Sequence, residues 1–288
     1  MLLSTQTDYM SRTFGPTEGV RKLCQAGYDA LDLSLFSMNN EDAVENGPDY
    51  RSYAAELKAA AAEYNVPFRQ AHAPFGGGYD FYTGTLLPRM PRAFEIAALC
   101  GVKTIIVHPL TQGRYYGRAE ELFRMNMEFY RRLLPVAKEY DLVIGVENMW
   151  EWDERREVIC DSVCAPPEEL CRYVDTLNDP HFTVCLDIGH VGLCGREPQD
   201  AIRAIGHDRL GALHVHDVDY RHDLHTLPYC GQYDWEPICR ALHDVQYRGD
   251  LTFEADNFFE HFPVEMAEDA ARFMVKVGRN LIARIEKD

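Results

Sequence analysis

Apolar and β-branched residues recur along the chain in eight short runs, separated by longer amphipathic stretches. Most of the runs are apolar throughout rather than alternating, which is typical of parallel strands that are covered on both faces. The predicted strands lie at residues 2–6, 30–35, 66–72, 103–108, 142–147, 182–187, 210–216 and 251–256.

A stretch with helical periodicity follows each run, and Pro and Gly mark several of its ends. The predicted helices lie at residues 16–27, 49–65, 88–101, 118–140, 166–177, 197–206, 234–245 and 263–285. Strict alternation of eight strands with eight helices predicts an α/β fold, a single (β/α)8 TIM barrel over residues 1–288. An open doubly wound sheet is the alternative, but it usually has a GxGxxG turn after an early strand, which this sequence lacks.

Length and composition agree with one large core. The chain has 288 residues, 46% of them hydrophobic, and no Gly/Ser-rich or Pro-rich linker divides it.

The first ten residues lack the basic region of a signal peptide, and no apolar run approaches the roughly 18 residues that span a bilayer. The nine cysteines form no CxxC pair, which favours reduced thiols. We therefore expect a cytoplasmic protein without a membrane partner.

The formal net charge of −17 narrows the choice of partners. A field of this sign repels phosphate backbones and anionic membranes, so it disfavours nucleic acid as a partner. It does not exclude a small neutral substrate, and a bound cation can invert the sign locally. Whether the chain forms a homo-oligomer is left open.

Residues that bind divalent metals stand at the carboxyl ends of most predicted strands. In a barrel these ends meet at one mouth. They carry His72, His108, Glu147, Asp187, His190, His214, His216 and Glu254, and the loop after the seventh strand adds Asp223 and His225. Singly, each has an ordinary explanation: a solvated His, a helix cap or a core ion pair. Together, such explanations require several costly buried charges. We therefore predict a site for a divalent ion of Mn, Mg, Co or Zn.

Aromatic and basic residues near the same ends are candidates for substrate binding. Phe75 follows the third strand and Trp150 the fifth, so both could form the wall of a sugar pocket, although packing within the loops would explain each equally well. Arg221, in the loop after the seventh strand, could pair with a phosphate.

Seven motifs, in this order and spacing, are similar to those of a known family. They are AHAPF (71–75), IVHP (106–109), GVEN (145–148), CLDIGH (185–190), HVHD (214–217), DLHTLPYCGQYDW (223–235) and TFEA (252–255). The chain thereby resembles the xylose-isomerase-like barrel superfamily of sugar phosphate isomerases and epimerases, which includes endonuclease IV. The LPYCGQ segment departs from the usual Pro-Gly-x-Gly form of its loop.

The resemblance implies a divalent-metal-dependent sugar, or sugar phosphate, isomerase or epimerase. In the ketose epimerases the ion is held by residues that fall on Glu147, Asp187, His214 and Glu254. Glu147 and Glu254 would then move a proton next to a ketose carbonyl through an enediolate, with His190 and His216 near the substrate.

Two other functions stay open. One is an abasic-site phosphodiesterase like endonuclease IV, with up to three zinc ions, whose further ligands would fall on His72, His108, His190, Asp223 and His225. The other is a non-catalytic sugar-binding barrel.

Overall fold

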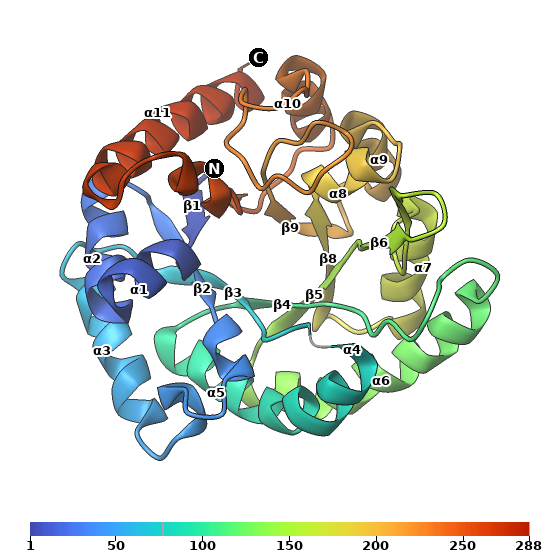
Figure 1. The fold of residues 1–288 in the computed structure, drawn as a ribbon, viewed down its shortest axis with the longest axis horizontal. Helices are drawn as coiled ribbons and strands as arrows, with labels where there is room; N and C mark the ends of the chain where they lie inside the picture. Colours follow the sequence, from blue (N-terminus) through green and yellow to red (C-terminus); the bar gives the residue numbers. More distant parts are fainter. Residues whose placement is uncertain (77, 288) are drawn as a thin grey trace.

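The computed structural model describes residues 1–76 and 78–287. Eight parallel strands form a ring with helices outside it (Figure 1). In sheet order they are β10 (Leu251–Phe253), β1 (Leu3–Gln6), β2 (Ala30–Ser34), β3 (Phe68–His72), β4 (Thr104–Val107), β5 (Val143–Glu147), β8 (Phe182–Asp187) and β9 (Leu210–His214). Just beyond β9, the Val215 amide donates to the Thr252 carbonyl at 2.9 Å, which joins β9 to β10. The (β/α)8 prediction is confirmed.

The outer helices lie close to their predicted positions. They are α2 (Pro16–Ala26), α3 (Tyr50–Ala62), α5 (Met90–Cys100), α6 (Ala119–Tyr140), α7 (Pro167–Leu177), α9 (Pro198–Ile205), α10 (Trp235–Asp244) and α11 (Ala267–Ile285). Three short helices lie between a barrel strand and its outer helix: α1 (Asp8–Phe14) after β1, α4 (Gly78–Phe81) after β3 and α8 (Ile188–Leu193) after β8. The prediction for the last helix began too early, because Val264–Met266 form a separate 3-10 turn.

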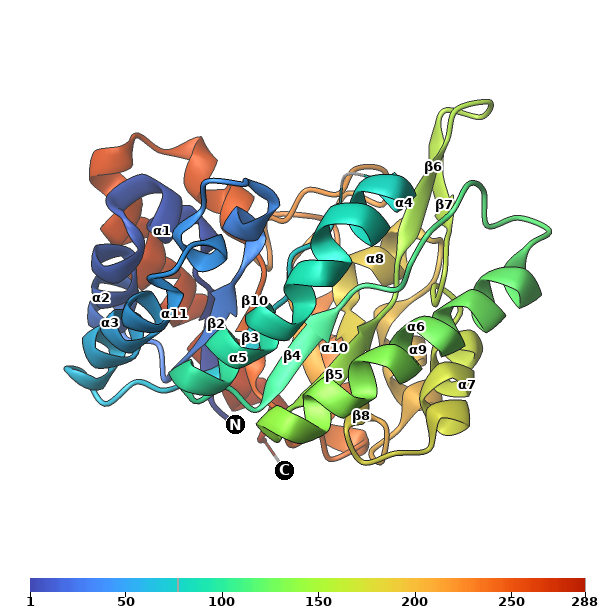
Figure 2. The same cartoon turned by 90° about the horizontal axis from the view of Figure 1, so that it is seen from below.

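Two further strands were not expected. β6 (Trp150–Asp153) and β7 (Val158–Asp161) form an antiparallel hairpin after β5, and Figure 2 shows it projecting beyond the barrel. The chain between and around them is rich in charged residues, and Trp152 and Val158 are exposed. The hairpin therefore lacks the apolar pattern of the barrel strands, which is why the sequence did not reveal it.

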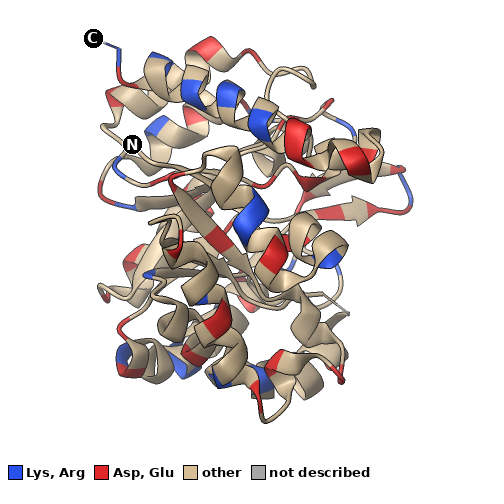
Figure 3. Ribbon diagram, turned by 90° about the vertical axis from the view of Figure 1, so that its left-hand side faces the viewer, with Lys and Arg blue, Asp and Glu red and all other residues tan. Residues whose placement is uncertain are grey.

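The outside of the barrel carries charges of both signs, interspersed along the helices in Figure 3. Many form ion pairs between neighbouring elements, such as Arg279 with Asp29 and Arg209 with Asp175. Exposed pairs of this kind contribute little stability individually. No helix in the described part of the chain is long and apolar enough to cross a membrane.

Part of the barrel interior is a small buried cluster packed around a glycine. Ile106, Cys185 and Ala212, from β4, β8 and β9, form a buried cluster of their own. Gly145 lies between them on β5, where an added Cβ would meet Ile106 Cδ1 at 2.6 Å and Cys185 Cβ at 3.3 Å. Only glycine fits there without displacing a neighbour, so the side chains of Ile106 and Cys185 pack against each other over β5.

Gly145→Ala is expected to lower the free energy of unfolding by about 1–3 kcal/mol through overpacking. Gly84→Ala is the matched control, because Gly84 is exposed and no atom lies within 4 Å of its added Cβ. Urea denaturation followed by circular dichroism measures both. Equal stability of the two variants would contradict the tight packing described for the β5 interior.

Candidate metal centre

Four buried side chains from the last barrel strands converge at the mouth. Glu147 ends β5, Asp187 ends β8, His214 ends β9 and Glu254 follows β10. Asp187 and His214 are direct register partners across the β8–β9 pair. One potential ligand atom from each of the four lies within 4.8 Å of the others. We call these four residues the first ligand group.

The geometry around His214 fits a shared cation better than hydrogen bonding. Its Nδ1 lies 2.9 Å from Glu147 Oε1 and 3.0 Å from Glu254 Oε2, and one ring nitrogen carries at most one proton to share between them. Neighbouring ligands that are 2.0–2.2 Å from one ion lie about 3 Å apart. The two carboxylates and the imidazole are therefore spaced as ligands of one ion would be.

His72, His108 and Glu147 form a second ligand group beside the first. His72 Nδ1 lies 2.8 Å from the Ala73 carbonyl, which can only accept, so this nitrogen donates and Nε2 carries a lone pair. That Nε2 lies 3.1 Å from His108 Nε2. Glu147 Oε2 is 3.0 Å from His108 Nε2, yet it has no well-directed hydrogen bond within the described residues. One atom from each of the three residues therefore faces a common point, with His72 Nε2 3.6 Å from Glu147 Oε2.

His190, Asp223 and His225 form the core of a third ligand group. His190 Nδ1 lies 2.8 Å from the Asn148 carbonyl, and His225 Nδ1 lies 2.9 Å from the Glu254 carbonyl. Both Nδ1 atoms therefore donate to the backbone, which turns both Nε2 atoms toward Asp223 at 3.7 and 3.1 Å. This backbone support is typical of imidazoles that bind metals.

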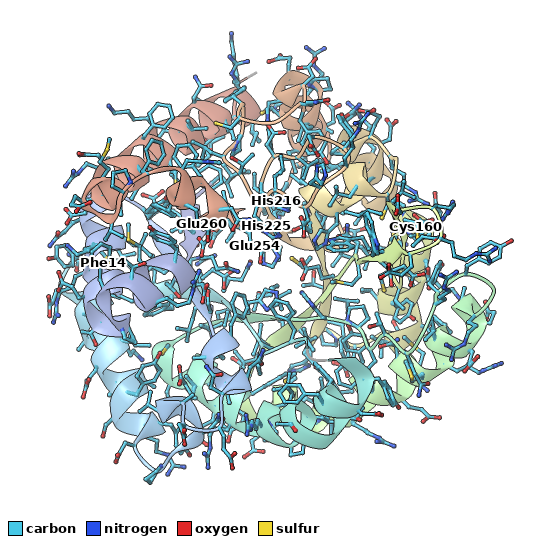
Figure 4. All side chains as sticks on the ribbon, viewed as in Figure 1. Phe14, Cys160, His216, His225, Glu254 and Glu260 are labelled. Carbon is cyan, nitrogen blue, oxygen red and sulfur yellow. The ribbon has the colours of Figure 1, made fainter. Side chains whose placement is uncertain are left out.

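His216 joins the third ligand group to the first. Its ring stacks on His225 at a centroid distance of 4.1 Å, and its Nε2 lies 3.0 Å from Asp187 Oδ1. Figure 4 places His216, His225 and Glu254 together near the barrel axis. Asp187 Oδ1 also accepts from the His190 amide at 2.7 Å, so this residue caps α8 as well as facing the mouth.

The charges of these side chains depend on one another. Burial alone would raise the pKa of Glu147, but the imidazoles of His214 and His108 hold it well below its usual range. Burial opposes the charged form of His214 too, yet its anionic neighbours raise its pKa well above the ordinary value. Burial lowers the pKa of His225, but the attraction of the Asp223 carboxylate is larger and raises this pKa to about 10. Protons on these imidazoles thus balance the carboxylates, and a divalent ion that displaced them would do the same.

Three polar residues that the sequence reading missed support the first ligand group from β1, β2 and β3. Gln6 Nε2 donates to Glu254 Oε1 at 2.8 Å. Asp32 Oδ2 accepts from Gln70 Nε2 at 2.8 Å and lies 3.5 Å from His214 Nε2. All three side chains are buried. For Asp32 and Gln70 the available signal was a polar residue inside a strand, whereas Gln6 ends its strand and was missed because only charged residues and His were considered there.

Of the predicted substrate-binding residues outside the ligand groups, two lie beside these groups and one does not. The Phe75 ring lies 4.4 Å from the His108 ring, and Trp150 Nε1 donates to Asp223 Oδ2 at 3.1 Å, so both border the ligand groups. Arg221 is exposed in the loop after β9. Within the described residues no side-chain hydrogen bond or ion pair connects it to the three groups.

Comparison with known proteins agrees with this architecture. Residues 20–277 match the family described as xylose isomerase-like TIM barrel. An L-ribulose 3-epimerase from Methylomonas sp. (strain DH-1) is 24% identical over 277 residues, covering 93% of this chain and 85% of that protein. A crystal structure of a D-tagatose 3-epimerase-like protein has a TM-score of 0.75 at 16% identity, covering 99% and 100% of the two chains. The IolI protein, solved with a zinc atom, has a TM-score of 0.74 at 16% identity, and both chains are covered completely. The chain therefore belongs to the xylose isomerase-like TIM barrel family.

Proposed function

We propose that this protein is a divalent-metal-dependent isomerase or epimerase of a ketose. The observation that carries the proposal is the pair of buried carboxylates, Glu147 and Glu254, that flank His214 Nδ1 at 2.9 and 3.0 Å. β8 and β9 separate β5 from β10 in the ring, so the two carboxylates approach the centre from different parts of the barrel wall. The epimerases among the related proteins, and the zinc atom in the IolI structure, support the same reaction class.

Glu147, Asp187, His214 and Glu254 would hold the ion. A divalent ion bound there polarises a ketose carbonyl and makes the neighbouring C–H more acidic. The donor set, three carboxylates and one imidazole, suits Mn, Mg, Co or Zn. His72 with His108, and His190 with Asp223 and His225, offer two further positions beside it.

Glu147 and Glu254 would then exchange the proton. One carboxylate removes it from the carbon next to the carbonyl, and an enediolate forms. The other carboxylate returns a proton to the enediolate. Each well-placed acid or base contributes about 10²–10⁴-fold to the rate. Gln6, which donates to Glu254 Oε1, holds that carboxylate in place during the exchange.

A second candidate is an abasic-site phosphodiesterase. The three adjacent ligand groups favour it, because each group could hold one of three neighbouring ions. The net charge of −17 opposes it, since phosphate contacts supply much of the affinity for DNA. A nicking assay on an abasic duplex distinguishes this activity from sugar epimerisation.

Turnover is expected to incorporate solvent deuterium at the carbon next to the carbonyl of a ketose. Glu147→Gln and Glu254→Gln should each slow this exchange by about 100-fold or more, because each removes an acid–base group. NMR in D2O measures the exchange, and elemental analysis checks that each variant retains its ion. Absence of exchange across a broad panel of ketoses and ketose phosphates would refute the proposal, and sugar binding without exchange would indicate a binding protein.

The epimerase proposal also predicts one tightly bound ion per chain. Native mass spectrometry of the metal-reconstituted protein counts the ions. Asp187→Asn should lose the ion, because it removes a ligand of the first group, whereas His225→Gln, in the third group, should retain it. Three ions per chain, with one lost from His225→Gln, would instead favour the phosphodiesterase.

Asp32→Asn is expected to weaken metal binding by about 10–100-fold, the usual effect of losing a carboxylate behind a ligating imidazole. If His214 bound the ion, its other ring nitrogen, Nε2, would carry the proton, and Nε2 lies 3.5 Å from Asp32 Oδ2. Competition with a chelator measures the dissociation constant without relying on activity. Asp175→Asn, which removes an exposed carboxylate paired with Arg209, is the control. Equal metal affinities in the two variants would show that Asp32 does not support metal binding.

A further inference from the structure

A cavity of 190 Å³ lies against the second ligand group. His108 forms part of its wall, and most of the remaining wall is aromatic or aliphatic, from Phe75, Tyr79, Tyr82, Leu110, Met149 and Trp150. These residues come from the segments after β3, β4 and β5. Figure 2 shows two of these elements, α4 and β6, close together at the mouth of the barrel.

The cavity adjoins the proposed reaction centre, because His108 lies in its wall and His108 Nε2 is 3.0 Å from Glu147 Oε2. The Phe75 ring contacts both His108 and His72, at centroid distances of 4.4 and 5.1 Å. Trp150, on the other wall, donates to Asp223 of the third ligand group. A substrate whose carbonyl lies at the first ligand group can therefore extend a substituent into this space.

The wall of the cavity does not suit a charged substituent. Among its described residues there is no Lys, Arg, Asp or Glu, and His108 at one edge is the only titratable nitrogen, so a phosphate or carboxylate would lose hydration for little compensating charge. This cost is larger for a dianion than for a neutral group. The wall therefore favours a neutral substituent over the phosphate of a sugar phosphate.

An unsubstituted polyol chain is also poorly matched. Apart from His108, the side-chain polar groups around the cavity are the hydroxyls of Thr111, Tyr79 and Tyr82 and the Trp150 indole, and the indole already donates to Asp223. Each sugar hydroxyl that is buried without a partner costs about 1–3 kcal/mol. An apolar cavity of about 150 Å³ accommodates benzene, so a volume of 190 Å³ admits a six-membered apolar ring.

We propose that this cavity binds an apolar, ring-sized substituent that is joined to the reacting sugar. The substrate class is then a keto-sugar conjugate with an aryl or comparable aglycone, rather than a free ketose or a sugar phosphate. The inference rests on the proposed epimerase function for the identity of the sugar part. The proposal that the cavity binds an apolar substituent depends only on the residues that line it.

Calorimetry on the metal-loaded protein tests the cavity with paired probes. The pairs are phenyl and methyl β-D-glucopyranoside, and the 6-O-benzyl and 6-O-methyl ethers of fructose, with fructose 6-phosphate as the charged probe. In at least one pair the aromatic member should bind about 10–100-fold more tightly, as expected for burial of a ring. Fructose 6-phosphate should bind no better than fructose.

Met149→Arg should abolish the preference for the aromatic member, because it places a guanidinium at the half-buried Met149 position in the wall. Met266→Arg, the same change at an exposed methionine elsewhere, should leave the preference intact. Thermal unfolding checks that both variants fold. Equal affinities within both pairs, or tighter binding of the phosphate, would overturn the cavity assignment.

The two proposals fail in different ways. Deuterium exchange with free ketoses, together with no aromatic preference, would refute the cavity assignment and leave the epimerase function intact. An aromatic preference that Met149→Arg removes, without exchange on any keto-sugar, would refute the epimerase function and leave the cavity assignment intact.

Discussion

The constraint on which this structure depends is the burial of three carboxylates around one imidazole. Glu147, Asp187 and Glu254 converge with His214 at the barrel mouth, and all four are nearly inaccessible to solvent. An uncompensated buried charge costs several kcal/mol even after the protein relaxes. The arrangement is therefore tenable only with positive charge at its centre, supplied either by protons on the imidazoles or by a metal ion.

The rest of the barrel serves this convergence. Gly145 and the cluster of Ile106, Cys185 and Ala212 fill the barrel interior one layer below the residues of the mouth on β4, β5, β8 and β9. The strands that contribute few ligands hold the others in place, since Gln6 fixes Glu254 and Asp32 faces the far side of His214. The strands thus contribute both the packed interior of the barrel and the side chains that orient the ligands at its mouth.

The sequence predicted the barrel and its ligand groups for a simple physical reason. Buried parallel strands are short and continuously apolar, so a polar residue that ends one, such as Glu147 or Asp187, stands out, and the fold brings all such ends together. Asp32 was missed because it lies within its strand, where polarity is less conspicuous. The β6–β7 hairpin was missed because its solvent-exposed, charged strands lack that apolar pattern. Which imidazole nitrogen faces which carboxylate also depends on backbone contacts that the sequence does not contain.

The ligand groups do not by themselves determine the reaction. Glu147 is shared by the first and second groups, and His216 connects Asp187 to the third, so the same cluster could serve a sugar carbonyl or a phosphodiester. The two substrates differ in what surrounds the reacting atoms. A phosphodiester needs cationic walls, whereas the wall beside His108 carries aromatic rings and no charged residue in the part of the chain described. With a net charge of −17, the surroundings favour a neutral substrate, and its chemistry follows from the walls as much as from the ligands.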